Sequence, residues 1–426
     1  MSRFFGIIGI IVIFAICFLM SNNKKKISLK TVISGFVLQI LLAIFVLKTT
    51  VGQVIFSKMG LFVEKLLDFA NEGGNFVFGV LTSKPQEFIE LFGAGSDFIF
   101  ALKLIPTIIF VLILVNILYH VGIMQKLVYV CAKVMYKIMN ISGAEALSNA
   151  ASAFVGQVEA QIMIKPYLSS MTMSELLASM TGSMACIAGG VMAMYIGMGI
   201  PAEYLLSASI MAAPGALVVS KIVFPETEES QTKDDVKIEV KQTHVNLIDA
   251  IAHGASDGMR VSINVIAMLI ALIALIHMID WVLGYLGLFL VNICHLPAGF
   301  LGIDFLNLSM KEILGSIFSI FAFLMGVPFA EASTVGSLMG TKLVFNEFLA
   351  YMDLSQIQAT LSPKSIIIAT FALCGFANLG SIAIQIGGIG ELAPSRRKDL
   401  AKLGFKALIC GTLASYVSAC IAGILL

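Results

Sequence analysis

Two glutamates could carry chemistry because each lies within a stretch of small and apolar residues. Glu159 follows Gln157 by two positions, and Glu347 directly follows Asn346, so an amide side chain accompanies each carboxyl group. An ionisable residue is costly inside an apolar segment, and there it commonly marks the path of a solute or an ion. Carboxylates and amides together supply many hydrogen-bond donors and acceptors with little net charge. This set suits a neutral solute rich in hydroxyl or amide groups better than a phosphate or a carboxylate.

The two glutamates occupy corresponding places in two similar segments, residues 143–167 and 328–351. Each segment opens near a Glu-Ala pair, continues through glycines and small residues, places a glutamate late and ends at a tyrosine. Each is too interrupted to cross a membrane, which predicts a re-entrant hairpin. An apolar span broken by glycine follows each hairpin, and the breaks fall at residues 186–191 and 375–381. Irregular backbone at membrane depth is tolerated where it lines a cavity, so these segments indicate the binding site of a secondary transporter.

A structural role is the alternative for these acids. Each glutamate could be paired with a lysine of its own segment, Lys165 or Lys342, or be protonated and hydrogen-bonded. The hairpin context favours the functional interpretation of both. The earlier acids of the two segments, Glu145 and Glu331, are better explained as caps of helix N-termini.

The composition requires a membrane. Of the 426 residues, 58% are hydrophobic and only 12% are charged, and the mean hydropathy is +0.97. Soluble proteins carry about 25% charged and about 45–50% apolar residues. The net charge of +1 gives no attraction for a polyanion, so a nucleic-acid partner is excluded. The seven cysteines lie in apolar stretches without a CxxC pair, which favours buried packing over disulfides or a zinc site.

Runs of roughly 20 apolar residues predict membrane-crossing helices. Eight such runs occur, at residues 4–20, 31–47, 101–119, 176–200, 204–224, 261–282, 366–389 and 403–426. The fold class is therefore an all-α polytopic membrane protein with about eight transmembrane helices plus two re-entrant hairpins. The hairpins are expected to enter from opposite sides of the membrane, so that they and the broken spans form an inverted repeat.

Basic clusters orient these helices by the positive-inside rule. Lys24–Lys26 and Lys30 follow the first span, which places the first loop in the cytoplasm and the N-terminus outside. The same topology places three lysines after the third span, the hydrophilic loop at 225–245 and the basic run at 396–398 in the cytoplasm. Both termini are therefore predicted to lie outside the cell membrane. The hydrophilic loop is expected to be a solvated tether between the two halves of the chain.

Motifs for other functions are missing from the sequence. There is no GxxxxGK[ST] loop, so an ATP-driven pump is not supported. The five histidines contain no i, i+4 pair and no HExxH motif, so an intramembrane zinc protease is not supported either. The sequence therefore predicts no enzyme, no metal centre and no organic cofactor.

Longer motifs fill the segments that contain the hairpins and the broken spans. They are GAEALSNAASAFVGQVEA (143–160), SMTGSMACIAGGVMAMY (179–195), AFLMGVP (322–328), TKLVFNEFLAY (341–351), GFANLGSIAIQIGGIGELAP (375–394) and RRKDLAKLGFKALICGTLA (396–414). In these motifs the chain resembles the concentrative nucleoside transporter family, and the similarity covers most of its length. The resemblance implies a bacterial cation-coupled nucleoside symporter that forms a homotrimer, with a scaffold and a moving transport domain in each protomer.

The resemblance also implies roles for the residues that match the family's motifs. The nucleobase would face the first hairpin tip and the helix that follows it, at Gln157, Val158, Glu159 and Val191. The ribose would bind the second hairpin and the second broken span, at Glu347, Asn378 and Ser381, with Phe376 lining the pocket. The chemistry agrees, because a carboxylate accepts bonds from vicinal hydroxyls and an amide both donates and accepts, as a base edge requires.

The chain departs from the family's pattern at positions that bear on base preference and ion coupling. The family's usual hairpin tip, GQTEAP, reads GQVEAQ at 156–161, so Val158 lacks a hydroxyl. The sodium site of sodium-coupled members resembles a cage of oxygens that includes Asn and Ser side chains. The corresponding positions are Ser152, Val155, Cys186 and Ile187. A sulfur atom is a poor ligand for a hard cation, whereas backbone carbonyls remain suitable.

Proton coupling through Glu159 or Glu347 is therefore favoured over sodium coupling, because a carboxyl group can carry the proton itself. Asn149 lies three residues before Ser152 and is a possible replacement ligand. The predicted function is the import of nucleosides across the inner or plasma membrane by alternating access. Sodium-coupled symport, a passive facilitator or channel and a nutrient sensor that does not transport are the alternatives.

The expected organisation has five parts. These are N-terminal scaffold spans at 1–140, a first transport repeat at 141–224, a cytoplasmic loop with an interfacial helix at 225–257, a scaffold span with its connection at 258–310, and a second transport repeat at 311–426.

Overall fold

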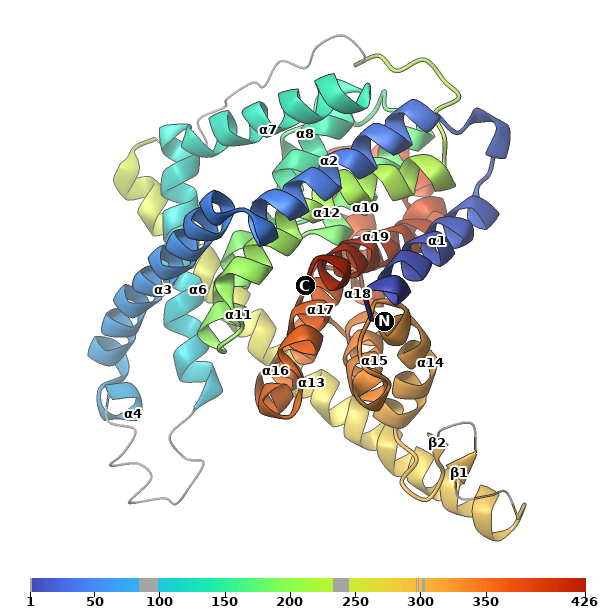
Figure 1. Cartoon of the computed structure of the whole chain (residues 1–426). Coiled ribbons are helices and arrows are strands. Elements are labelled where there is room, and N and C mark those ends of the chain that lie inside the picture. The colour runs from blue at the N-terminus through green and yellow to red at the C-terminus, as the bar shows by residue number, and fades with distance from the viewer. Residues whose placement is uncertain (1, 84–98, 233–244, 296, 298, 301–302) are drawn as a thin grey trace.

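The computed structural model describes residues 2–83, 99–232, 245–295, 297, 299–300 and 303–426 (Figure 1). Within these residues nearly all regular structure is helical, and the only strands are the short antiparallel pair β1 (Gly299–Phe300) and β2 (Ile303–Asp304). Six helical segments of this part of the chain are long and apolar enough to cross a membrane: Leu29–Lys48, Ala101–Val121, Met173–Gly197, Ala202–Val223, Leu247–Asn292 and Pro394–Leu425. The predicted all-α polytopic fold is confirmed.

Two helices form the centre of the molecule. They are α12 (Ala202–Val223) and α19 (Arg397–Leu425), and 89% and 83% of their apolar windows are buried. The helix α10 (Met173–Ala185) packs against both of them, and α1 (Ser2–Met20) and α2 (Leu29–Lys48) cover them from the other side. The core thus combines helices from the beginning, the middle and the end of the chain.

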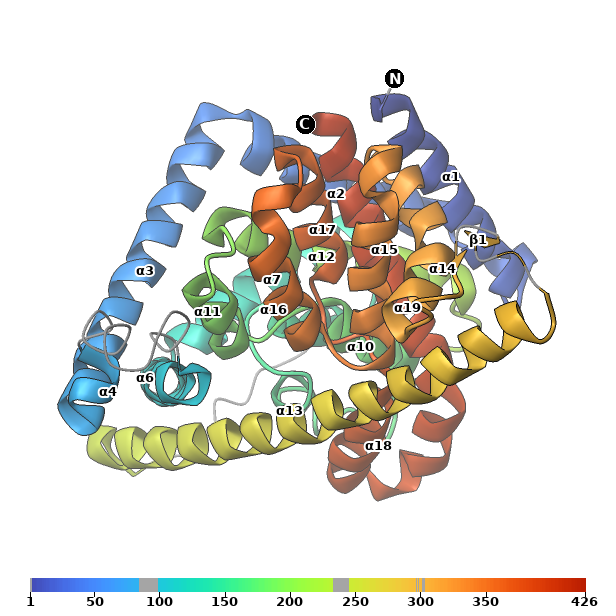
Figure 2. The ribbon, with the colours of Figure 1, turned by 90° about the horizontal axis from the view of Figure 1, so that it is seen from below.

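A frame of three helices borders this core. It consists of α3 (Thr50–Phe78), α6 (Phe100–Val121) and α13 (Leu247–Asn292), and α6 packs against the other two. Figure 2 shows α3 and α13 along two edges of the molecule. Only 17% of the apolar window of α6 and 11% of that of α13 are buried. These two helices therefore present a wide apolar surface outward, as expected for contact with lipid or another membrane protein.

Two glycines let α13 lie directly against α6. A Cβ at Gly254 would come within 2.7 Å of the Ile113 Cα, and one at Gly258 within 2.5 Å of the Ile109 Cα. Ser262, one turn further, is buried and continues the same face. Small residues spaced by four are a common means of bringing two helices together in a membrane.

Several helices extend or add to the predicted spans. The span expected at 261–282 is part of the 46-residue helix α13. Residues 50–78 and 123–139 form the helices α3 and α7 (Ile123–Met139), which were not predicted from the sequence because charged residues interrupt their apolar pattern. The remaining short elements are α4 (Val80–Ser83) and the 3-10 turns Lys24–Lys26, Gln358–Thr360 and Pro394–Arg396.

Both predicted hairpins are pairs of helices that meet at a tip. The first consists of α8 (Gly143–Ser152) and α9 (Glu159–Ile162), and the second of α15 (Phe329–Val344) and α16 (Glu347–Ile357). The helix α14 (Met310–Leu324) leads into α15 through a bend of 117°. These elements place Glu159 and Glu347 each at the first position of the second hairpin helix.

Both spans that follow the hairpins are broken, as the glycines predicted. The first is divided into α10 and α11 (Gly189–Gly197), and the second into α17 (Pro363–Leu373) and α18 (Leu379–Leu392). The two breaks leave helix ends inside the protein, where their backbone groups need partners.

Candidate functional site

Glu347 is buried at the tip of the second hairpin and accepts two hydrogen bonds from neutral donors. Its side chain is only 5% exposed. Tyr195 of α11 donates from its hydroxyl to Oε1 at 3.1 Å, and Asn378 at the α17–α18 break donates from Nδ2 to Oε2 at 3.1 Å. Among the described residues neither Glu347 nor Glu159 forms an ion pair, so the alternative of pairing with Lys342 or Lys165 is not found.

Asn378 performs two tasks at the second break. It is the N-cap of α18, and its Oδ1 accepts a hydrogen bond from the Ser381 backbone N–H at 2.9 Å. Its amide nitrogen is thereby directed to Glu347. Ser381 is 1% exposed and Phe376 is half-buried, so the structure places the four residues predicted for the ribose side around one break and one hairpin tip.

The two breaks cross each other in the centre of the protein. The Phe376 backbone N–H donates to the Cys186 carbonyl at 3.3 Å. Gly375 has a φ of +111°, and a Cβ there would lie 2.5 Å from the Ala185 carbonyl oxygen. Only glycine satisfies both requirements, so a glycine break in one repeat is fitted to the helix end of the other.

The first hairpin tip contacts both broken spans. The Gly189 N–H donates to the Phe154 carbonyl at 3.1 Å, which joins the tip to the α10–α11 break. Val158 packs on α18, where a Cβ added to Gly388 would lie 2.6 Å from its Cγ2. Gln157 has a buried amide oxygen without a hydrogen-bond partner in the described structure. This oxygen is therefore free to accept a hydrogen bond.

The predicted nucleobase residues are less closely joined than the ribose residues. Glu159 is exposed, and its carboxylate folds over Gly156. Val191 is half-buried on α11, one turn before Tyr195. No hydrogen bond among the described residues links Gln157 or Glu159 to Glu347, so a solute would have to bridge the two sides.

Two of the four positions equivalent to the sodium cage, Ser152 and Cys186, have side chains that are hydrogen-bonded within the protein. The Ser152 hydroxyl donates to the Ser148 carbonyl at 2.8 Å and lies 3.2 Å from the Ser183 hydroxyl. The Cys186 thiol is fully buried and donates to the Ser209 carbonyl at 3.7 Å. The Val155 and Ile187 side chains are also buried.

Gln161, the residue that replaces the family's proline, fills the space beside Ser152. Its Nε2 donates to the Ser183 hydroxyl at 2.7 Å and to the Ser148 hydroxyl at 3.1 Å, and its Oε1 accepts from the Ser179 hydroxyl at 2.5 Å. All five side chains are buried. We name Ser148, Ser152, Ser179 and Ser183 with Gln161 the hydroxyl cluster, which fastens both helices of the first hairpin to α10.

Asn149 also fastens the first hairpin. Its Nδ2 donates to the Glu145 carbonyl at 2.9 Å and to the Ala178 carbonyl at 3.2 Å. Its amide oxygen packs against Gly182, where an added Cβ would lie 2.1 Å away. The Asn149 side chain therefore joins α8 to α10 one turn away from Ser152.

Two helix caps and a buried ion pair stabilise the N-terminus of the first hairpin. Ser142 with Glu145 and Thr172 with Glu175 form two capping boxes, which confirms the capping role predicted for Glu145. The Lys221 ammonium lies 2.7 Å from the Glu145 carboxylate and donates to the Ser174 hydroxyl at 2.9 Å. Burial of both charges is possible because each has a partner.

The loop after α12 is packed against these caps where it begins. Glu226 accepts from the Thr172 hydroxyl at 2.8 Å, and the Thr232 carbonyl accepts from the Gly143 N–H at 2.8 Å. Residues 227–229 and 231 are exposed, as a solvated tether predicts, whereas Pro225 and Thr232 are buried against the protein. Residues 233–244 lie outside the described part. Glu331 caps α17 and not its own helix, because it accepts from the Ser362 N–H and hydroxyl at 3.1 and 2.9 Å.

Comparison with known proteins identifies the family. Residues 204–423 match the family described as "Na+ dependent nucleoside transporter C-terminus", residues 8–81 match its N-terminal counterpart, and residues 101–202 match "nucleoside recognition". The chain belongs to the concentrative nucleoside transporter family. Its members are cation-coupled nucleoside transporters and not enzymes, and the apolar helices make this chain a membrane protein.

Relatives of this transporter cover its whole length. A nucleoside permease of Helicobacter pylori is 38% identical over 99% of this chain and 98% of its own length. A sodium/nucleoside cotransporter of Mus musculus is 36% identical over 98% of this chain and 63% of its own length. A solved concentrative nucleoside transporter in an inward-facing, substrate-bound state superposes with a TM-score of 0.91, at 40% identity over 100% of this chain and 98% of that one.

Tyr195 contacts the candidate site but was not predicted from the sequence. It ends the motif at 179–195 and lies four positions after Val191, on the same face of α11. Its ring stacks on Tyr351 of the second hairpin, with centroids 4.3 Å apart. The helical spacing from Val191 was the available signal, but the bond to Glu347 depends on tertiary packing.

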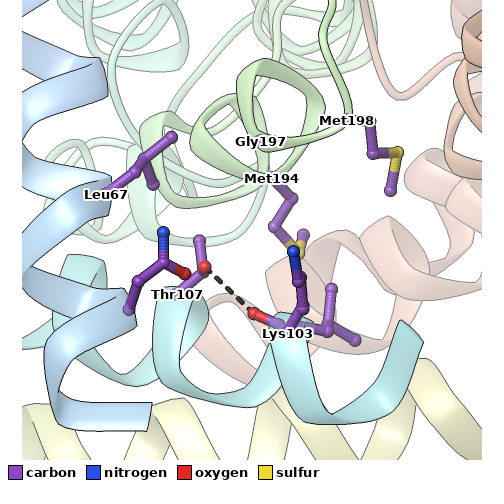
Figure 3. Close-up of a pocket in the computed structure, with 8 residues that line it drawn as sticks. Leu67, Lys103, Thr107, Met194, Gly197 and Met198 are labelled. Carbon is purple, nitrogen blue, oxygen red and sulfur yellow. Dashed lines mark hydrogen bonds between the residues drawn. The ribbon is translucent and has the colours of Figure 1, made fainter. Parts of the chain in front are cut away.

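A small cavity lies between the transporter's frame and α11 (Figure 3). It is lined by Leu67 and Asn71 of α3, by Lys103, Leu104 and Thr107 of α6, and by Met194, Gly197 and Met198 of α11. Its volume is ≈ 100 Å³. Ligand pockets typically measure about 300–1,000 Å³, so this cavity is too small for a nucleoside and suits a few water molecules.

Proposed function

We propose that this transporter imports nucleosides and binds their ribose at Glu347, Asn378, Ser381 and Phe376. The observation that carries the proposal is the buried carboxylate of Glu347, which is bonded by two neutral groups and by no cation among the described residues. Such a carboxylate can accept further hydrogen bonds from vicinal hydroxyls. The base would contact Gln157, Val158, Glu159 and Val191, and the unpartnered Gln157 oxygen supports this side of the site.

The coupling ion that we propose is a proton in place of sodium. The Ser152 hydroxyl is held within the hydroxyl cluster, and a thiol at Cys186 replaces an oxygen ligand. Asn149 joins α8 to α10 through its amide nitrogen, while its buried amide oxygen has no hydrogen-bond partner among the described residues and remains available as a cation ligand. The preference for a proton therefore rests on Ser152 and Cys186 and not on Asn149. Carboxyl groups remain at Glu159 and Glu347, and either could carry a proton through the transport cycle.

The proposed cycle is alternating access, in which the hairpins and the broken spans move together past a scaffold. We assign the scaffold to the frame of α3, α6 and α13, because α6 and α13 present most of their apolar surface outward. The same surface is suited to contacts between the protomers of a homotrimer. Figures 1 and 2 place the N- and C-termini near each other, which supports a topology with both termini on the same side of the membrane. The basic clusters of the sequence are the reason to propose that this side is outside the cell.

The test is uptake of radiolabelled uridine and adenosine into proteoliposomes, with sodium and proton gradients imposed separately. Uphill uptake driven by the proton gradient alone is the expected result. Uphill uptake driven by sodium would overturn the coupling proposal, and uptake that never exceeds equilibrium would identify a passive facilitator. Glu347→Gln, reconstituted to the same level, is expected to lose uptake, whereas unchanged uptake would remove Glu347 from the site.

A further inference from the structure

Lys342 of α15 is a buried cation that is bound by backbone carbonyls. Its side chain is 1% exposed, and its Nζ donates to the Ala372 carbonyl at 2.9 Å and to the Cys374 carbonyl at 3.1 Å. Among the described residues no carboxylate lies within ion-pair distance of it. This environment of carbonyl oxygens is the kind that proteins otherwise provide for a bound monovalent or divalent cation.

The two carbonyls belong to the C-terminal end of α17. Helix ends leave their last carbonyls without intrahelical partners, and the helix dipole makes that end negative. The other carbonyls here also have donors, since Thr370 accepts from the Tyr351 hydroxyl at 2.7 Å and Cys374 accepts a second bond from the Ser415 hydroxyl at 2.7 Å. Lys342 supplies the only charged side-chain donor to the described end of this helix.

The corresponding helix end in the first repeat has no such side chain. The α10 helix ends at Ala185, and the Cys186 carbonyl accepts only from the Phe376 backbone N–H among the described groups. This end adjoins Cys186 and Ile187, two of the positions equivalent to the family's sodium cage. The two repeats therefore have the same kind of break, one next to a candidate ion site and one occupied by a lysine ammonium.

We infer that Lys342 is a tethered cation that replaces a bound ion in the second repeat. Its ammonium neutralises the end of α17 and holds the backbone from Ala372 to Cys374 in place, so that Asn378 is presented to Glu347. The ribose side of the site would thus be assembled without a bound metal ion. Lys342 is a positioning residue, because it acts on the site through the break and not by contact with the solute.

The inference rests on the proposed nucleoside site for its binding readout, and a second readout is independent of that site. Lys342→Met removes the charge and keeps most of the stem, Lys342→Arg keeps the charge, and Lys342→Ala leaves a space beside the two carbonyls. Lys165→Ala, on the exposed side of the first hairpin, is the matched control. The measurements are uridine affinity and the thermal unfolding temperature of the purified full chain, each with and without methylammonium chloride.

We expect Lys342→Met to weaken uridine binding roughly tenfold or more, the range for a lost hydrogen bond to a charged group. Lys342→Arg should lose less than Lys342→Met. Methylammonium should raise the unfolding temperature and the uridine affinity of Lys342→Ala while leaving wild type and Lys165→Ala unchanged. This selective rescue would be specific to a cation role. If Lys342→Ala lost only packing contacts, methylammonium chloride would stabilise it no more than an equal concentration of sodium chloride does.

The inference is wrong if folded Lys342→Met binds uridine as wild type does, or if Lys342→Arg and Lys342→Met lose affinity equally. It is also wrong if methylammonium fails to stabilise Lys342→Ala. Should wild type bind no nucleoside, the proposed function fails by itself, and the methylammonium effect on the unfolding temperature still decides the role of Lys342.

Discussion

The hydroxyl of Tyr195 donates to Glu347 at 3.1 Å, joining two residues that are 152 positions apart. The bond connects the broken span of the first repeat with the hairpin tip of the second. Tyr195 also stacks on Tyr351, whose hydroxyl donates to the Thr370 carbonyl at the end of α17 at 2.7 Å. Tyr195 therefore orients the Glu347 carboxylate directly, and Tyr351 binds the C-terminal end of α17.

The substitution Tyr195→Phe separates these two roles. It removes the donor to Glu347 and keeps the ring that stacks on Tyr351. Because a hydrogen bond to a charged group contributes about 1.5–3 kcal/mol, we expect the KM for uridine to rise roughly tenfold or more. The measurement is the concentration dependence of uridine uptake in proteoliposomes that contain equal amounts of protein.

Tyr351→Phe is the matched control for this prediction. It also removes one buried hydroxyl, but the lost bond is to a backbone carbonyl away from Glu347. It should lower the unfolding temperature and leave the KM for uridine within about a factor of five, because a neutral hydrogen bond contributes only about 1 kcal/mol. Equal KM values for wild type and Tyr195→Phe would contradict the assigned role of Tyr195.

The sequence predicted the elements better than it predicted their partners. The glycines near 186–191 and 375–381 located both breaks, because glycine disfavours a regular helix and permits irregular backbone. The helices α3 and α7 were missed because charged residues along one face keep their mean hydropathy low. The two breaks were predicted separately, but their crossing at Phe376 and Cys186 depends on packing between distant segments.

Lys342 shows the same limit at the level of one side chain. Its position five residues before Glu347 suggested an ion pair within the second hairpin. The structure turns its ammonium to two carbonyls of α17, residues that lie 30 and 32 positions away in the sequence. The periodicity of a helix indicates which face a residue occupies, but it does not say which helix end is placed beside that face.

Sodium dependence should be recoverable by restoring the lost oxygen ligands. In Ser152→Asn/Cys186→Ser, the two side chains that the family's sodium cage uses are present again. We expect a sodium gradient to raise uridine uptake roughly fivefold or more, the lower range of ordinary coupling between two ligands. Gln161→Pro in the same background removes the amide that binds Ser183 and Ser148, and it should increase the effect further.

The matched control is Cys131→Ser, a change of the same chemistry on α7, far from the hydroxyl cluster in sequence and half-exposed. It should leave uptake independent of sodium. If the restored double variant is folded and transports nucleosides without any response to sodium, the proposal that Ser152 and Cys186 abolish sodium coupling is wrong.

The contact between Val158 and Gly388 should control how the first hairpin tip approaches α18. A Cβ at residue 388 would lie 2.6 Å from the Val158 Cγ2 and 2.8 Å from its Cγ1. A β-branched side chain has little freedom to move away, so Gly388→Ala should cost about 1–3 kcal/mol and reduce uptake. Val158→Ala should restore uptake in the Gly388→Ala background, measured as a double-mutant cycle; strictly additive losses would rule out the contact.

The ion pair of Lys221 and Glu145 should determine the stability of the first hairpin. The charged groups lie 2.7 Å apart, with side chains only 6% and 3% exposed, and Glu145 also closes a capping box with Ser142. Lys221→Met leaves a buried carboxylate without its partner, which should cost about 3–5 kcal/mol and lower the unfolding temperature in detergent. Lys65→Met is the control. It breaks the exposed pair of Lys65 and Asp68, whose side chains are 63% and 64% exposed, and should cost at most about 1 kcal/mol.

A double variant tests whether Lys221 acts through Glu145. Glu145→Gln keeps an acceptor for the capping box while removing the charge, so adding it to Lys221→Met should recover more than half of the lost stability. A double variant no more stable than Lys221→Met would mean that Lys221 acts through Ser174 and Glu226 and not through Glu145.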